Sequence, residues 1–503
     1  MSSNAKSVFS GSVWGIIAKV LDAIAKFITI PMLVGLYGKA DYGLIALSFS
    51  LNAYMQLMDL GFNLGSIRFF SRWISDVNWV QIEKVSRSST IFYGVIGILN
   101  AILFLVLAQY ADHFFKLTPS QIPIFRWMLI ILASGSIFNW VSNVISQLLT
   151  ANGQLGWVNR VTIISSLFNF ITAYCAVVFK LSISVYFLLY TLSTILVIPL
   201  NLWKLKIGEM AWWQLLSPKW DKIAFNEILG YSLSIFAIGI FQFSADNLRP
   251  LFLGRYSSQG ISVLTDYRVI QTMAMLVIAF GGVFLQALLP SAARLKVGED
   301  HEKIRNMVFN GTKYISIFLS FIVFILILNA DILLKLYMGQ GYTSLALCLI
   351  LWLLTVLLQK HNAPVASMLL SSGKTKLLAY VSAISCIISL PITIILAPTY
   401  NVGAAVIGYL VYSMLEISFF YFYYIPFVLK LNSFELFFKS FMLSVVSGAL
   451  AAFITYYFSG FLLESKIITL LINSALFSIV YAIIVFFVIM GKRDTQLIMQ
   501  KIR

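Results

Sequence analysis

The stretch SVWGIIAKVLDAIAKFITIPML, residues 12–33, has the length of a membrane span but carries charges near its middle. About twenty mostly apolar residues suffice for a helix to cross the hydrocarbon core of a bilayer. Lys19, Asp22 and Lys26 interrupt this apolar run. On a helix that turns by about 100° per residue, these three residues share one face, and Val, Ile, Leu and Phe cover the others. The stretch therefore predicts a membrane helix with one polar face.

This face is costly to expose to lipid. Each Lys or Asp near the middle of a span costs roughly 3 kcal/mol of insertion free energy, and each apolar residue returns only about 0.5 kcal/mol. We therefore expect the face to line a hydrated cavity. Two other interpretations stay open: the Lys19 side chain can extend to the cytoplasmic interface, and Asp22 can form a structural ion pair with Lys19 or Lys26.

The rest of the chain repeats the pattern of apolar runs. Its 503 residues are 60% hydrophobic and 11% charged, whereas soluble domains are about half apolar and a quarter charged. The runs predict an all-α polytopic membrane protein with about fourteen transmembrane helices. The predicted spans are 11–33, 41–66, 87–109, 122–149, 157–179, 182–203, 227–252, 261–290, 307–329, 343–370, 376–397, 402–429, 437–458 and 467–490. The first span lacks a cleavage site, so we expect it to be retained.

The net charge of +16 reflects topology rather than nucleic-acid binding. Most lysines and arginines between spans lie on the side of the N-terminus, among them Lys204, Lys219, Arg294 and Lys303. The positive-inside rule then predicts that both termini are cytoplasmic, as in a multi-pass protein of a bacterial inner membrane. We expect membrane lipids, and no nucleic acid, as partners.

A weak internal repeat suggests two lobes. Asp41-Tyr-Gly-Leu44 opens the second span and Ser258-Gln-Gly-Ile261 opens the eighth, while Gly153 and Gly373 follow the fourth and tenth. We expect the last two glycines to adopt left-handed turns at helix ends. The predicted organisation is a six-helix lobe (1–203), a cytoplasmic or interfacial linker rich in Trp and Lys (204–226), a second six-helix lobe (227–430) and two additional helices with a tail (431–503).

Polar stripes recur in several spans of both lobes. The second span carries Ser48, Asn52, Gln56, Asp59 and Asn63, and the fourth carries Ser136, Asn139, Asn143 and Gln147. The seventh adds Asp246 and Arg249, the eighth Arg268, the tenth Lys360 and the twelfth Glu416. One stripe can join two helices, but several together indicate a shared water-filled cavity.

The charges on these stripes favour an anionic ligand. The cations Lys19, Lys26, Arg249, Arg268 and Lys360 slightly outnumber the acids Asp22, Asp59, Asp246 and Glu416. We predict that the cations bind a phosphate or diphosphate together with Asn52, Gln56 and Asn143, and that the acids position them or couple transport to an ion. Other interpretations stay open: Asp246 and Arg249 can neutralise each other, and interfacial solvation can account for Asp266 and Arg268.

Several activities find no support in the sequence. There is no P-loop motif and no cluster of Cys and His with metal-ligand spacing, so no catalytic residue, metal or other cofactor is expected. Coupling to H⁺ or Na⁺ stays open. The connectors predicted to face outward are short, which disfavours a membrane polysaccharide polymerase or ligase. The remaining class is a secondary transporter rather than an enzyme.

Three motifs carry a resemblance to a known family. They are Leu36-Tyr-Gly-Lys-Ala-Asp-Tyr-Gly-Leu-Ile-Ala46, Asp59-Leu-Gly-Phe-Asn-Leu-Gly-Ser-Ile-Arg68 and Asn152-Gly-Gln154. With the helix count, they make the whole chain resemble the Wzx-type O-antigen and polysaccharide repeat-unit flippases of the multidrug/oligosaccharidyl-lipid/polysaccharide superfamily. The resemblance implies two six-helix bundles in a V with two appended helices. It also implies a polyprenyl-diphosphate-linked oligosaccharide as cargo, flipped to the outer leaflet by alternating access, and polysaccharide polymerase or assembly proteins as partners.

The resemblance also bears on the cavity. The related lipid II flippases line their cavity with basic residues in the first, second and eighth helices. Here Lys19 and Lys26 match in the first helix and Arg268 in the eighth, but the second has Asp59 in mid-span and Arg68 only at its cytoplasmic end. A multidrug exporter of organic cations is the alternative within the same fold, and it would favour an acidic cavity.

Overall fold

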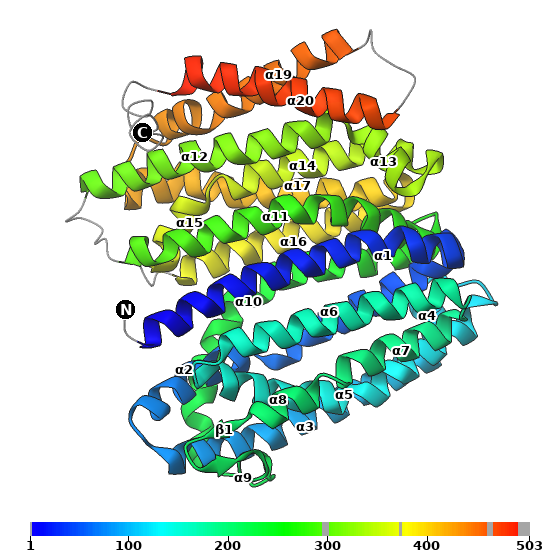
Figure 1. Ribbon diagram of the computed structural model, residues 1–503, viewed down its shortest axis with the longest axis vertical. Helices are drawn as coiled ribbons and strands as arrows, with labels where there is room; N and C mark the ends of the chain where they lie inside the picture. The colour runs from blue at the N-terminus through cyan, green and yellow to red at the C-terminus, as the bar shows by residue number, and fades with distance from the viewer. Residues whose placement is uncertain (1–2, 294–300, 372–374, 460–465, 491–503) are drawn as a thin grey trace. The chain divides into compact units, whose positions relative to one another are not determined.

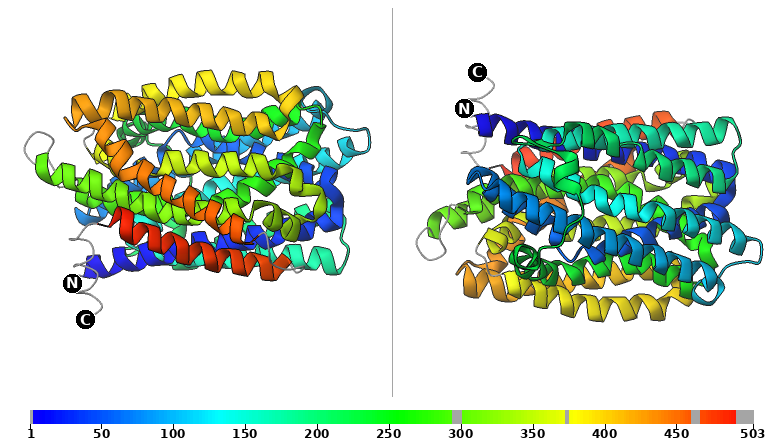
Figure 2. Two further views of the ribbon diagram at one scale, coloured as in Figure 1. Left: turned by 90° about the horizontal axis from the view of Figure 1, so that it is seen from above. Right: turned by 90° about the horizontal axis from the view of Figure 1, so that it is seen from below.

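A computed structural model describes residues 3–293, 301–371, 375–459 and 466–490 of the chain. The described part is almost entirely helical and divides into two compact units. Unit 1 comprises residues 1–272 and 390–405, and unit 2 comprises residues 273–389 and 406–503. Figures 1 and 2 show that the long helices within each unit run alongside one another.

Unit 1 is built around long helices joined by short turns. Its elements are α1 (Ser3–Met55), η1 (Gln56–Asp59), α2 (Phe62–Ser75), α3 (Trp79–Gln109), α4 (Ala111–Phe114), α5 (Gln121–Ala151), α6 (Leu155–Val178), α7 (Ile183–Ile195), α8 (Ile198–Lys204), β1 (Lys206–Ile207), β2 (Met210–Ala211), α9 (Trp212–Leu216), α10 (Lys222–Tyr256) and η2 (Gly260–Ser262). The strands β1 and β2 form an antiparallel hairpin. The first part of α11 (Val263–Ala293) also belongs to unit 1.

Unit 2 begins within α11 and contains the C-terminal helices. Its other elements are α12 (His301–Leu328), α13 (Ala330–Met338), η3 (Gln340–Leu345), α14 (Ala346–Lys360), α15 (Ala363–Ser371), η4 (Phe420–Val428), α18 (Ser433–Glu435), η5 (Leu436–Met442), α19 (Leu443–Ser459), α20 (Lys466–Ile484) and η6 (Val485–Ile489). The helices α16 (Thr375–Tyr400) and α17 (Val402–Phe419) are shared, because their adjoining ends belong to unit 1.

The helices confirm an all-α membrane protein. In the described part, ten helices are long and apolar enough to cross a membrane. They coincide with the predicted spans three to six and nine to fourteen. The other four predicted spans also fall on helices: the first two on α1, η1 and the start of α2, the seventh on α10 and the eighth on η2 and α11.

Two predicted spans are less regular than a continuous helix. The second span leaves the α-helix after Met55, passes through η1, and turns at Leu60 and Gly61, which have positive φ, before α2 begins. The tenth is broken between Lys360 and Ala363, so α14 and α15 are separate helices. Polar residues on either side of such a break do not continue one straight stripe.

α1 bends where the first two predicted spans meet. Gly38 has φ 79° and ψ 167°, a conformation that glycine adopts without a Cβ clash. The fourth span ends as predicted: Gly153 has φ 73°, and the Gln154 N–H donates to Leu149 O, as in a Schellman cap. Gly373, predicted to cap the tenth span, lies outside the described residues.

The core of unit 1 includes part of the linker, residues 204–226, that the sequence predicted to lie in the cytoplasm or at the membrane surface. Leu205, Ile207 and Leu215 are buried in a cluster with Phe62 and Phe225. Beside them, the tryptophans of α9 remain exposed, as an interfacial segment requires. Asp221 caps α10 by accepting from the Ala224 N–H, and this bond together with Lys84 holds the pKa of its carboxyl below the usual range.

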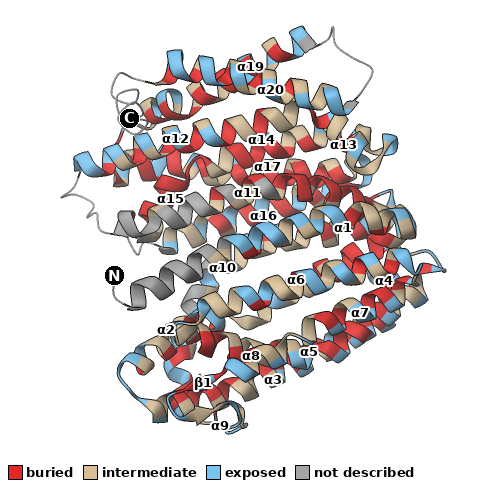
Figure 3. Ribbon diagram, in the orientation of Figure 1, coloured by how far each residue is buried: buried red, intermediate tan, exposed pale blue. Residues whose placement is uncertain are grey.

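α5 is the central helix of unit 1. In the most apolar 18-residue segment of α5, 56% of the residues are buried, compared with 22% in the corresponding segment of α6. Figure 3 shows the same contrast. α5 packs against α3 on one side and α7 on another, and α6 packs along α1. In unit 2, α12 packs beside α19, and α19 beside α20 (Figure 1). A second buried cluster joins α12, α15, η4 and η5.

Candidate functional site

The charged face of α1 forms a local ion pair. Lys26 Nζ lies 2.7 Å from Asp22 Oδ2, and Ser166 on α6 donates to the other carboxylate oxygen at 3.3 Å. The side chains of Lys26 and Asp22 are 53% and 39% exposed, and Lys19 is also exposed. Of the two pairings that the sequence left open, the structure contains the one with Lys26. Asp22 thus holds a lysine whose ammonium group remains accessible.

Arg268 extends from α11 to α1. One of its guanidinium nitrogens donates to Gln271 Oε1 at 2.8 Å, and another donates to Ser50 on α1 at 2.9 Å. Ser50 follows Phe49, whose ring centroid lies 4.8 Å from that of Tyr190 on α7. The structure therefore places two predicted cationic contacts on α1 or against it: Lys26 belongs to this helix, and Arg268 binds Ser50 of the same helix.

A polar pocket opens beside this tyrosine. It has a volume of about 310 Å³ and lies between α1 with η1, α5 and α7. Its lining includes four amide side chains, Asn52, Gln56, Asn139 and Asn143. Phe49, Trp140 and Tyr190 contribute aromatic rings, and serines and threonines complete the polar lining. We refer to it as the amide pocket.

The amide pocket gathers residues from two stripes that the sequence identified. Asn52 and Gln56 come from the second predicted span, and Asn139 and Asn143 from the fourth. None of these four amide groups has a hydrogen bond to another side chain or backbone group in the described ranges of the chain. Among the described residues that line the pocket, none carries a charge. The pocket thus offers uncommitted donors and acceptors to a neutral polar ligand.

Asp59 lies in a separate network rather than on the stripe of Asn52 and Gln56. Tyr93 Oη donates to Asp59 Oδ1 at 2.5 Å, Gln147 donates to the Tyr93 oxygen at 2.7 Å, and the Asn63 N–H donates to Asp59 Oδ2 at 3.0 Å. Tyr93 also stacks on Trp140 of the amide pocket. The break after Met55 accounts for this difference, because η1 redirects the chain before Asp59.

The pair in α10 forms as one interpretation of the sequence suggested. Arg249 Nη1 lies 3.4 Å from Asp246 Oδ1, and the arginine is buried whereas the aspartate side chain is 52% exposed. The contact is long for a charge-assisted hydrogen bond. Arg249 is therefore part of the interior of unit 1.

The predicted cavity residues Lys360 and Glu416 belong to unit 2. Lys360 is the last residue of α14, and its aliphatic stem lies against Gly281 of α11. Gln359 donates to Glu416 Oε2 at 3.0 Å and accepts from Tyr409 at 2.7 Å. The neighbouring His361 is buried, contacts Tyr421 and stacks on Phe441. It therefore packs in the core at the break between α14 and α15.

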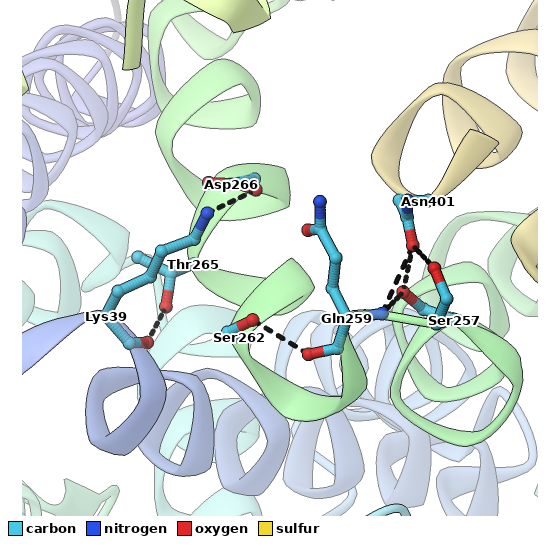
Figure 4. A network of polar contacts seen from close by, with 8 residues as sticks. Lys39, Ser257, Gln259, Ser262, Thr265, Asp266 and Asn401 are labelled. Atoms are coloured by element: carbon cyan, nitrogen blue, oxygen red, sulfur yellow. Dashed lines mark hydrogen bonds and ion pairs between the residues drawn. The ribbon is translucent and has the colours of Figure 1, made fainter. Parts of the chain in front are cut away.

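A second polar cluster, the kink junction, joins the bend of α1 to the start of α11 (Figure 4). Lys39 Nζ lies 2.8 Å from Asp266 Oδ2, and Thr265 donates to the Lys39 carbonyl at 2.6 Å. Nearby, Asn401 Oδ1 accepts from Ser257, Ser258 and the Gln259 N–H. Asp266 is 3% exposed. Of the interpretations that stayed open, interfacial solvation does not account for Asp266, because its carboxylate is buried beside Lys39.

The kink junction also joins two landmarks of the internal repeat. A Cβ atom added to Gly43 would lie 2.5 Å from the Ile261 carbonyl oxygen. The glycine of the Asp41–Leu44 motif thus lets α1 touch η2, which contains the Ser258–Ile261 motif. Sequence reasoning identified both motifs but not their contact, and it missed Lys39, Phe49 and Tyr190. The separation of Lys39 from Asp266 by 227 positions leaves no local signal.

The described helices define a multi-pass membrane protein, and solved structures share its fold. A lipid II flippase, MurJ in an inward closed conformation, superposes with a TM-score of 0.73 at 12% identity, over 95% of this chain and 100% of that one. An inward-facing multidrug transporter of the MATE family, in the MOP superfamily, gives 0.62 at 13% identity over 87% and 95%. A MOP superfamily transporter from Pyrococcus furiosus, reported with a binding pocket of reverse polarity, gives 0.56 at 13% identity over 89% and 96%.

Residues 32–347 match the family model described as polysaccharide biosynthesis protein. The chain belongs to this polysaccharide biosynthesis family and has the fold of the MOP superfamily transporters. No curated protein sequence gives a significant match to it. The resemblance found in the sequence is thus confirmed at the level of family and fold.

Proposed function

We propose that the protein flips a polyprenyl-diphosphate-linked oligosaccharide from the cytoplasmic to the outer leaflet. The observation that carries this proposal is that Arg268 contacts Ser50, beside the pocket-lining Phe49 and Asn52, while Lys26 presents an accessible ammonium group on the same helix. A diphosphate needs cationic contacts, and an oligosaccharide needs neutral hydrogen-bonding groups. The family and the fold support the same class of cargo.

In this mechanism Lys26 and Arg268 bind the diphosphate, and Lys360 is a further cationic contact proposed for the cargo. Lys26 keeps its ammonium group accessible because its side chain and that of its ion-pair partner Asp22 are both partly exposed. Such contacts are moderate in strength, which suits a cargo that must also be released. We propose that alternating access changes these contacts as the protein opens to one leaflet and then the other.

We propose an inner-membrane location with both termini in the cytoplasm, on the basis of the charge asymmetry of the connectors. Reporter fusions after Arg503 and within residues 330–342 should report opposite sides of the membrane. Two fusions reporting the same side would contradict the topology. The direct partners are then the lipid-linked oligosaccharide and membrane lipids, with polysaccharide polymerase or assembly proteins as further candidates. No enzymatic step is proposed, and coupling to H⁺ or Na⁺ would involve acids such as Asp59 or Glu416.

The alternative is an exporter of organic cations, because MATE transporters share the fold. The aromatic rings of the amide pocket would suit a flat cation, but its described lining supplies no carboxylate. Purified protein in liposomes distinguishes the two. We expect it to expose lipid-linked oligosaccharide on the opposite leaflet and not to transport tetraphenylphosphonium. Transport of the cation without flipping of the lipid would contradict the proposal.

A further inference from the structure

The amide pocket has a composition that suits one chemical class of ligand. A sugar hydroxyl both donates and accepts hydrogen bonds, and an amide side chain does the same with its NH₂ and carbonyl groups. Asn52, Gln56, Asn139 and Asn143 present four such groups to one cavity, each without a hydrogen-bond partner in the described part of the chain. A ligand with several hydroxyls can satisfy them together.

The aromatic rings of the lining suit the apolar surface of a sugar ring. The Phe49 and Tyr190 rings lie with their centroids 4.8 Å apart and form part of the lining. Aromatic faces attract the weakly positive C–H groups that cover one side of many sugar rings. A lining of both amide groups and aromatic rings thus presents the two kinds of surface that a sugar ring itself has.

Other parts of a lipid-linked oligosaccharide fit the pocket poorly. A diphosphate requires cations, and the described lining has none. A hydrocarbon chain would leave the amides unsatisfied away from water, at a cost for each group. The volume of about 310 Å³ is at the lower end of the roughly 300–1,000 Å³ of small-molecule sites, so the pocket admits a small part of an oligosaccharide.

The position of the pocket fixes which part of the cargo reaches it. Phe49 and Asn52 line the pocket, and Ser50 between them on α1 accepts a hydrogen bond from the Arg268 guanidinium at 2.9 Å. We propose that the amide pocket binds the sugar next to the diphosphate and thereby selects cargo by its sugar. This inference rests on the proposed function, because it assumes that the diphosphate contacts Lys26 and Arg268. It assigns the sugar specificity to α1, α5 and α7 of unit 1.

Binding of two lipids to the full-length protein in nanodiscs tests this assignment. The probes are the lipid-linked oligosaccharide extracted from the source cells and a bare polyprenyl diphosphate of the same chain length. The test variant is N139L/N143L, which keeps side-chain volume and removes both amides. Asn52→Leu repeats the test from α1 should the double variant fail to fold. Asn226→Leu is the matched control, because Asn226 is an exposed amide of α10 outside the pocket.

We expect the parent protein to prefer the oligosaccharide-bearing lipid. The double variant should bind that lipid roughly tenfold more weakly, as expected for two lost hydrogen bonds, and should bind bare polyprenyl diphosphate with unchanged affinity. Asn226→Leu should match the parent on both lipids. Equal affinity of the parent for the two lipids, or equal weakening of both in the double variant, would overturn the sugar assignment and leave the proposed function standing. Failure of the parent to bind either lipid would contradict the proposed function itself.

Discussion

At the scale of single residues, the charges in the middle of the first predicted span have a structural explanation. Asp22 pairs with Lys26 at 2.7 Å and also accepts from Ser166. Both members of the pair are more than one third exposed, so the pair itself contributes at most about 1 kcal/mol to folding. Its value lies in positioning an accessible ammonium group, and this can be separated experimentally from stability.

Asp22→Asn should leave thermal unfolding in detergent nearly unchanged and lower flipping of lipid-linked oligosaccharide only moderately. The asparagine retains a hydrogen-bond acceptor for Lys26 and Ser166 but loses the charge that holds the lysine in place. Thermal melts and flipping rates in liposomes would be measured on the same preparation. Complete loss of transport in a stable variant would show that Asp22 does more than position Lys26, for example by carrying a coupling proton.

Gly43 gives a second prediction at this scale. Gly43→Ala should destabilise the protein by about 1–3 kcal/mol, because the new Cβ would lie 2.5 Å from the Ile261 carbonyl oxygen and force α1 and η2 apart. Gly94→Ala is the matched control, since nothing lies within 4 Å of a Cβ there. The control should be neutral or stabilising by about 0.5–1 kcal/mol, as expected inside a helix. Equal melting temperatures for the two variants would disprove the close contact.

At the scale of elements, helix breaks decide where polar residues point. The spacing of Asn52 and Gln56 predicted a shared face, and both line the amide pocket. The same spacing placed Asp59 on that face, but η1 and the turn at Leu60 and Gly61 direct it to Tyr93. Helical periodicity predicts which residues share a face only while the helix continues. The apolar pattern of residues 41–66 does not indicate the break after Met55.

The contact between α1 and α11 leads to a prediction at this scale. Lys39→Met should lower the free energy of unfolding by roughly 1–3 kcal/mol, less than for a fully buried pair because the Lys39 side chain is 41% exposed. The loss arises because the Asp266 carboxylate would be left buried without its counter-ion. The double variant K39M/D266N should recover much of the stability, since it removes both charges. A double variant no more stable than K39M would argue against the ion pair as the source of the loss.

At the scale of the whole molecule, the sequence predicted the class of fold well and the site only in part. The lengths of the apolar runs predicted a polytopic helical protein, because the bilayer imposes those lengths on any span. The stripe of Asn139 and Asn143 predicted polar residues that meet Asn52 and Gln56 in one pocket. The lobe boundaries at 203, 226 and 430 remain a prediction.

Contacts between residues far apart in the sequence account for most of the site features that the sequence did not predict. Lys39 pairs with Asp266, and Tyr190 lies against Phe49 of α1 and lines the amide pocket. Tyr190 lies in a predicted apolar span, where an aromatic residue has no distinguishing pattern. The functional contacts of Lys26 and Lys360 with a common cargo stay proposals, since the two lysines belong to different compact units.

The most direct test of the cationic mechanism is restoration of surface polysaccharide in a strain that lacks its own repeat-unit flippase for the same cargo. Lys26→Gln and Lys360→Gln remove the charge and keep much of the length and polarity, so both should insert normally. Lys222→Gln, at an exposed position outside the predicted spans, is the matched control. We predict that the parent and Lys222→Gln restore surface polysaccharide, that both test variants fall far below them, and that Lys→Arg at either site retains part of the activity. Normal insertion and wild-type polysaccharide levels in both Gln variants would contradict the cationic mechanism.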